Sequence, residues 1–183
     1  MNYGILLIIL IALILGYLIS LYNSLATIKV KIKEAWSQID VQLKRRIDLI
    51  PNIVETVKGY ATHEKEVFEN VTKARASLMG ATTPAQASEA DNQLTGALKT
   101  LFAVAEAYPD LKAQEVFLNL QHELSDTEDK VAYSRQFYNS VVRQFNEIIV
   151  AFPGVIFAKM LGFTAEEFFE ATEIERQPVK VTF

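Results

Sequence analysis

Charged side chains, one histidine and the single tryptophan are concentrated in residues 35–66, on both sides of Pro51. The residues of this group are Trp36, Asp40, Lys44, Arg45, Arg46, Asp48, His63 and Glu64. The density has two explanations: an active site, or a helical hairpin whose charges hold two helices in register. The motifs and helices in the rest of the chain decide between them.

The sequence holds no recognisable metal site. A di-metal centre in a helical bundle needs a Glu-x-x-His pair on each of two helices and two further glutamates. The chain has two histidines, and the residues three positions before them are Tyr60 and Asn119. The sequence "HEKE" at His63 also lacks the second histidine of a zinc-protease motif. We therefore predict no metal and no other cofactor.

Nucleophilic catalysis finds equally little support. The absence of cysteine excludes thiol nucleophiles, and a serine triad would have to use His63 or His122. No serine lies in a glycine-flanked elbow, and no glycine-rich phosphate loop is present. We predict a protein without catalytic residues. The alternative is a hydrolase or metal-dependent enzyme that uses His63 and Glu64.

The N-terminal segment predicts a membrane anchor. No charged side chain precedes Lys29, and Ile5 to Leu21 are almost wholly aliphatic. A helix rises about 1.5 Å per residue, so this uncharged segment exceeds the roughly 30 Å of a hydrocarbon core. The rival interpretation is a cleaved signal peptide ending near Ser24–Ala26, but no basic residue precedes the apolar run.

Charge indicates an orientation and excludes one class of partner. The first lysines, Lys29, Lys31 and Lys33, follow the span, which favours an outside N-terminus, a cytoplasmic body and a single-pass protein of the cell membrane. The net charge is -4 and the pI is about 5.3, so a basic surface for nucleic acid is not expected. The lipid bilayer is the first predicted partner.

Apolar periodicity predicts four long helices, and the first of them is a continuation of the membrane span. The first continues from the membrane to Ile50, where Pro51 is expected to force a turn whose free amides Asp48 caps. The second runs from Ile50 to about residue 78, with Glu64 as the one acid in its apolar repeat and Lys44 or Arg45 as its expected partner. Gly80 is expected to cap the C-terminus of this helix. Thr83 is expected to cap the N-terminus of the third helix, and Pro84 to occupy its first position.

The remaining helices complete an all-α, antiparallel, four-helix-type bundle. An alanine-rich helix is expected from Pro84 to Tyr108, and a very long one from about Pro109 to Phe152. Pro153 and Gly154 end it, and a short apolar turn and a short helix capped by Thr164 and Glu167 should follow. The phenylalanines of this tail are expected to dock on the core, the alternative being a patch for another subunit or the membrane. A strand is conceivable only at "PVKVTF", 178–183.

Polar residues near the apolar seams suggest a structural role. Asp40, Lys44 and Asp48 follow one another at intervals of four, which brings side chains together on a helix. Asn139 and Asn146 are seven apart and share one helix face. If buried, these asparagines would fix the register of packed helices.

Several motifs resemble one family over nearly the whole chain. They are "YNSL", "EAWSQIDVQLKRRIDLIPNIVETVKGYATHEKEV", "YPDLKA", "LQHELSDTEDKVAYSRQFYN" and "FPG" followed by "GF". In these the sequence resembles the LemA family of bacterial membrane proteins. The resemblance implies one N-terminal membrane helix and an antiparallel helical bundle, with no established reaction or active-site residues. Some relatives are associated with membrane-organelle biogenesis, and others lie beside membrane metalloproteases.

The expected organisation is an anchor at 1–27, a bundle at 28–152 and a C-terminal helical segment and tail at 153–183. We predict a non-enzymatic scaffold that assembles with itself, as a homo-oligomer, or with other membrane proteins. An adaptor or sensor for a membrane metalloprotease is the second hypothesis. Trp36, Asp40, Lys44, Arg45, Asp48, Pro51, Glu64, Asn139 and Asn146 are the candidate structural or interaction residues.

Overall fold

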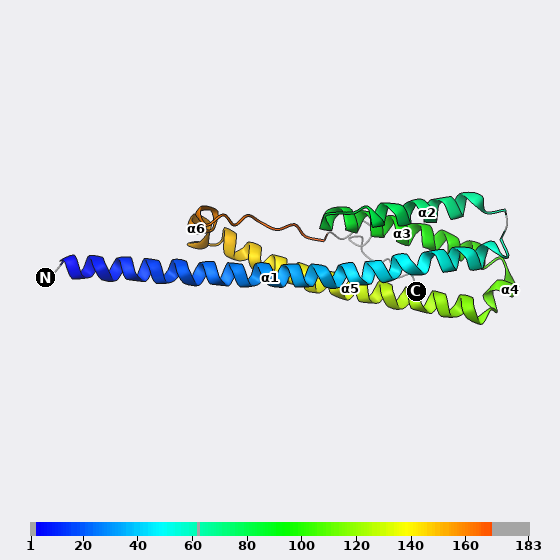
Figure 1. The fold of residues 1–183 in the computed structure, drawn as a ribbon, viewed down its shortest axis with the longest axis horizontal. Helices are drawn as coiled ribbons and strands as arrows, with labels where there is room; N and C mark the ends of the chain where they lie inside the picture. Colours follow the sequence, from blue (N-terminus) through cyan, green and yellow to red (C-terminus); the bar gives the residue numbers. More distant parts are fainter. Residues whose placement is uncertain (1–2, 62, 170–183) are drawn as a thin grey trace, which may run out of the picture.

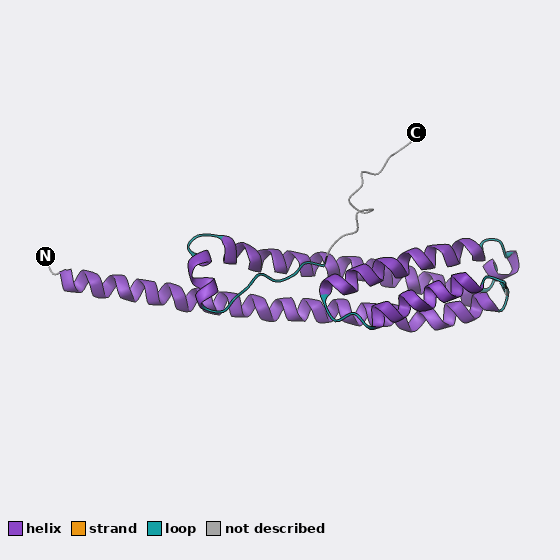
Figure 2. Ribbon diagram, turned by 90° about the horizontal axis from the view of Figure 1, so that it is seen from above, coloured by secondary structure: helices purple, strands orange, loops and turns teal. Residues whose placement is uncertain are grey.

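The molecule is a long helical rod, and the N-terminal part of its first helix projects beyond everything else (Figure 1). The computed structural model describes residues 3–61 and 63–169. Its helices in that part of the chain are α1 Tyr3–Lys58, α2 Lys65–Met79, α3 Pro84–Ala105, α4 Pro109–Lys112, α5 Glu115–Val150 and α6 Gly154–Met160. These residues contain no strand (Figure 2), which confirms the all-α fold, while the segment 178–183 lies outside them.

The bundle consists of two pairs of packed helices. Antiparallel α1 and α5 form the longer pair, and α2 packs mainly on α3 (Figure 1). The α2–α3 pair covers the half of α1 farther from the N-terminus, here called the distal half (Figure 2). The half of the α1–α5 pair nearer the N-terminus, the proximal half, therefore has fewer helices around it. The antiparallel arrangement is the expected one.

One stripe of α1 joins the apolar segment to the core. Buried side chains recur every three or four residues along it, from Leu21 to Val57. They lie on one helical face because the α-helix turns once in 3.6 residues. Leu25, Ile39 and Ile53 are fully buried, and each such side chain stabilises the fold by about 1.5–3 kcal/mol. The buried stripe of α1 thus begins at Leu21.

The predicted turn at Pro51 is wrong, because α1 continues through the proline to Lys58. A proline lacks the amide that would bond to the carbonyl four residues earlier, which here belongs to Ile47. That carbonyl instead accepts a hydrogen bond from Arg75 Nε of α2, at 3.0 Å. Arg75 therefore replaces the missing donor. Asp48 caps no turn, and the chain reverses only between the end of α1 at Lys58 and the start of α2 at Lys65.

The second reversal matches the prediction. Gly80 caps the C-terminus of α2, and Thr83 caps the N-terminus of α3 by accepting a bond from the Gln86 amide at 3.2 Å. Pro84 occupies the first turn of α3, where a missing amide does no harm. The expected fourth helix divides at residues 113–114 into the single turn α4 and the long α5.

The C-terminal segment differs from the expectation in its local structure. Residues 154–160, expected to form an apolar turn, are the helix α6, which is bent by 99° from α5. Residues 163–169 are extended, so the short helix predicted there is wrong. We call this extended segment the strap. It lies over the proximal half of the α1–α5 pair (Figure 1).

Candidate functional site

A buried ion cluster links the two helix pairs at the middle of the bundle. Arg46 of α1 is 1% exposed, and its Nη1 lies 2.5 Å from Asp91 Oδ1 of α3. Its Nη2 donates to Thr95 Oγ1 at 2.9 Å and lies 3.6 Å from Glu128 Oε2 of α5. One guanidinium thus connects α1, α3 and α5.

The ion cluster was not predicted from the sequence, although the positions of Arg46 and Asp91 within apolar stripes indicate it. Burial raises the pKa of the Asp91 carboxyl, and the attraction of Arg46 offsets this only in part. Arg46 and Asp91 each fall within an apolar stripe at three- and four-residue spacing, beside Leu43 and Leu94. A charge at such a position must be buried, and a buried charge needs a partner.

The remaining charges of the 35–66 stretch do not form the expected pairs. Trp36, Asp40, Lys44 and Asp48 do line one shallow groove of about 230 Å³, opposite the loop between α2 and α3. Within the described part of the chain, however, Asp40, Lys44 and Asp48 make no ion pair with one another. Their intervals of four mark an exposed helix face.

Glu64 does not belong to an apolar helical repeat, which corrects the prediction. It is the half-buried residue immediately before α2, and its carbonyl accepts from the Phe68 amide at 3.3 Å. Arg45, its expected partner, instead pairs with Glu123 of α5 at 2.5 Å. His63 beside it is exposed. Nowhere in 3–61 or 63–169 do three His, Asp or Glu side chains gather as a metal site would need.

The two asparagines of α5 hold the strap by its backbone. Asn139 Nδ2 donates to the carbonyl of Phe169 at 2.8 Å, and its Oδ1 accepts from the Phe169 amide at 2.9 Å. Asn146 makes the same two bonds to Glu166, each at 2.9 Å. Seven residues of helix and three of extended chain both span about 10 Å, which explains the matched spacing. The partner of each asparagine is the strap rather than a facing helix.

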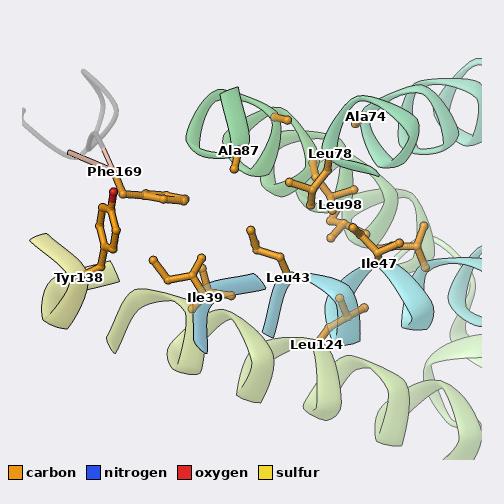
Figure 3. Close-up of a cluster of buried hydrophobic side chains, with 14 of the residues drawn as sticks. Ile39, Leu43, Ile47, Ala74, Leu78, Ala87, Leu98, Leu124, Tyr138 and Phe169 are labelled. Atoms are coloured by element: carbon orange, nitrogen blue, oxygen red, sulfur yellow. The ribbon is translucent and has the colours of Figure 1, made fainter. Parts of the chain in front are cut away.

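Aromatic side chains fix the end of the strap. Phe169 is 1% exposed and packs on Trp36 with ring centroids 6.4 Å apart, and Trp36 contacts Tyr138 at 5.9 Å. Figure 3 shows Phe169 and Tyr138 side by side near Ile39. The Tyr138 hydroxyl donates to the carbonyl of Glu167 at 2.9 Å. Burial, with smaller contributions from Glu166 and Glu167, raises the pKa of Tyr138 to about 12.

The other end of the strap is fixed in the same way. Phe163 packs between Tyr22 and Phe145, with centroids 5.7 and 6.2 Å away. Lys29 Nζ lies 3.0 Å from Glu166 Oε1, between the two aromatic anchors. The expected docking of the tail phenylalanines is thus seen for Phe163 and Phe169, whereas Phe168 is 42% exposed. The strap completes the core where the α2–α3 pair does not reach.

The N-terminal part of α1 has the properties of a membrane span. Its most apolar 18-residue window has a mean hydropathy of 2.9, and 6% of that window is buried. A core helix of a soluble protein would be mostly covered. This helix is long and apolar enough to cross a membrane, and its far end belongs to the bundle core.

Comparison with known proteins identifies the family. The model of the LemA family matches residues 35–183. Protein LemA of Metamycoplasma hominis is 30% identical, over 86% of this chain and 72% of its own length. Magnetosome protein MamQ of Magnetospirillum gryphiswaldense and magnetosome protein MamQ 1 of Paramagnetospirillum magneticum are 22% and 23% identical, over 86% of this chain and 68% of their lengths. With this extent of similarity, the chain belongs to the LemA family.

Proposed function

We propose that this protein is a membrane-anchored, non-enzymatic scaffold that assembles with copies of itself or with other membrane proteins. The observation that carries the proposal is the continuity of α1, which is apolar and bare at one end and forms the core of the bundle at the other. A helix without a break transmits position and orientation from the bilayer to the body. That geometry is better suited to holding and spacing proteins at a membrane than to catalytic turnover.

The polar constellations support a structural role. The buried charges of Arg46 and Asp91 are paired with each other, and Asn139 and Asn146 are bonded to the strap backbone. Each of these groups connects two segments of the chain. The similarity to proteins named as magnetosome proteins agrees with this class of function, because that name refers to a cellular structure and not to a reaction.

The proximal half of the rod offers a surface for assembly. Apolar side chains remain exposed on both helices of the long pair, at Val30 and Phe137 and, closer to the α2–α3 pair, at Val41 and Tyr133. Single exposed apolar residues are common, but here four of them lie on the two helices of one pair. A second copy, laid along this half, would bury them.

The mass of the particle extracted in mild detergent tests the proposal. We expect more than one chain per particle, and we expect a single-cysteine variant Tyr133→Cys to crosslink to itself in native membranes. Val116→Cys is the control, since Val116 is also well exposed, 61% against 75% for Tyr133, but lies at the distal end. A monomeric particle without crosslinks to itself or to another membrane protein would rule out the scaffold.

The enzyme alternative has its own test. His63 is exposed and Glu64 half-buried, and nothing in the described geometry assigns them to catalysis. We expect His63→Ala to leave both the cellular phenotype and the particle mass unchanged. A lost phenotype with an unchanged particle mass would favour the enzyme over the scaffold.

A further inference from the structure

The helix α6 and its flanks form an unusually apolar surface. Between Glu147 and Glu166 the only ionisable side chain is Lys159. Phe152 and Met160 are 81% and 79% exposed, and Val155 and Ile156 are about half exposed. These four side chains lie on one short bent segment, where water would meet almost only hydrocarbon. Such a surface marks an interaction site.

The place of α6 along α1 indicates what covers this surface. The ring of Phe157 packs on Tyr17 with centroids 6.0 Å apart. Tyr17 lies within the apolar run that ends at Leu21, about 6 Å before its end at a rise of about 1.5 Å per residue. Figure 1 shows α6 beside the projecting part of α1. A bilayer that surrounds the span up to Leu21 therefore reaches α6.

The backbone of α6 is suited to an apolar environment. Its C-terminus is closed by Gly162, at φ +81°, with Phe163 N–H donating to Ala158 O at 3.0 Å and Gly162 N–H to Lys159 O at 3.2 Å. At its N-terminus, Val155 N–H donates to Ala151 O at 2.8 Å. Lipid tolerates a backbone only when its polar groups are bonded internally.

The flanking side chains match the boundary of a membrane. Tyr17 and Tyr22 are both partly exposed, and tyrosine is enriched at the level of lipid headgroups. Lys159 has a long aliphatic stem that can carry its charge to the headgroups. The ion pair of Lys29 with Glu166 lies farther along α1, about 12 Å beyond Leu21, where water is expected.

We propose that α6, together with Phe152, inserts into the interfacial region of the same bilayer leaflet from which α1 emerges. This inference rests on the proposed membrane anchor and adds a second lipid-binding element to it. The two elements are fixed to each other by Tyr17 and Phe157, so the bilayer holds the rod at two places. The strap begins where α6 ends, and it connects this lipid contact to the core of the bundle.

The absence of cysteine makes a direct test possible with the full-length protein. The single variants Ile156→Cys and Met160→Cys carry a polarity-sensitive fluorophore, in vesicles of phosphatidylcholine and phosphatidylglycerol. Leu10→Cys in the span and Val116→Cys at the distal end are the controls. We expect both α6 labels to emit at shorter wavelength than the Val116 label, and to be quenched severalfold more by lipid-attached nitroxide than by aqueous iodide.

Three results would overturn the inference, and they have different meanings. If the Leu10 label is also reached by iodide, the anchor itself fails and α6 insertion fails with it. If Leu10 is in lipid while both α6 labels are reached by iodide, only α6 insertion fails. If neither quencher reaches the α6 labels, protein covers this surface instead of lipid.

Discussion

A single buried arginine contacts both helix pairs of this bundle. Arg46 reaches from α1 to Asp91 of α3 and toward Glu128 of α5, with almost no solvent around it. Removal of two ions from water is expensive, so such a pair contributes little net stability. Its value lies in specificity, because only one register of α1 against α3 brings the charges together.

Breaking this ion pair should be costly, whereas replacing both ions should not. We expect Asp91→Ala to lower the free energy of unfolding by about 3–5 kcal/mol, since it leaves Arg46 without its nearest counter-ion. The double variant Arg46→Met with Asp91→Leu should return to within about 1–2 kcal/mol of the wild type. Urea unfolding in detergent measures both.

The control for this prediction is Asp126→Ala, which removes an exposed i, i+4 pair with Lys130. Such exposed pairs are screened by water and contribute little to stability. An Asp91→Ala protein that loses no more than the Asp126→Ala protein would contradict the assigned role of the ion cluster.

Tyr138 should make the stability depend on alkaline pH. Its folded-state pKa is about 12, against 10.0 in the unfolded chain, so the folded state keeps the proton longer. The stability that this adds is complete below pH 10 and is lost as the pH rises toward 12. We therefore expect the wild type to lose stability relative to Tyr138→Phe across that interval. A constant difference between the two proteins would show that Tyr138 titrates normally.

At the scale of the helices, Pro51 and Arg75 form a unit. Proline removes the donor to Ile47 O, and Arg75 supplies another from α2. We expect Arg75→Met to lower the free energy of unfolding by about 1–3 kcal/mol, since the partly buried Ile47 carbonyl loses its donor. With Pro51→Ala the helix regains its own donor, so the same change of Arg75 should cost clearly less. Thermal unfolding of the wild type, the two single variants and the double variant gives the coupling energy between the two positions. If Arg75→Met costs the same stability with Pro51 as with Pro51→Ala, Arg75 does not replace the missing donor.

The strap should open locally when its asparagines are lost. Each asparagine makes two hydrogen bonds of about 0.5–1.5 kcal/mol net, so Asn139→Ala should speed hydrogen exchange at the Phe169 amide by about tenfold or more. Asn146→Ala should act on Glu166 instead. The exposed Asn119 of the same helix is the control. Unchanged exchange in both variants would mean that the other contacts of the strap hold it without the asparagines.

Helix periodicity predicted most elements because burial follows a simple repeat. The caps at Gly80, Thr83 and Pro84 were predicted because their signals are local. The continuation through Pro51 was not predicted, because the compensating donor, Arg75, lies in α2, 28 residues after the Ile47 carbonyl that it serves. The strap was mistaken for a helix since Thr164 and Glu167 have helix-start spacing, while the bonds that extend it come from α5. Partners distant in sequence leave no local pattern.

At the scale of the whole molecule, the unbroken α1 predicts how far the body stands from the membrane. From Leu21 to Lys58 the helix rises about 55 Å. The anchor and the bundle were both predictable from composition and periodicity. Where they join, α6 contacts α1 at Tyr17, and the strap contacts it at Tyr22 and Trp36.

Energy transfer to acceptors on lipid headgroups measures this distance. With donors placed on single cysteines of the full-length protein in vesicles, we expect strong transfer from position 160 and weak transfer from position 116. The reason is that Met160 lies beside the span, whereas Val116 lies at the distal end of the rod. A flexible joint after the span would let the rod fall onto the surface and make the two efficiencies alike. Equal transfer would therefore show that α1 does not hold the body upright, and a rigid scaffold would no longer follow from its continuity.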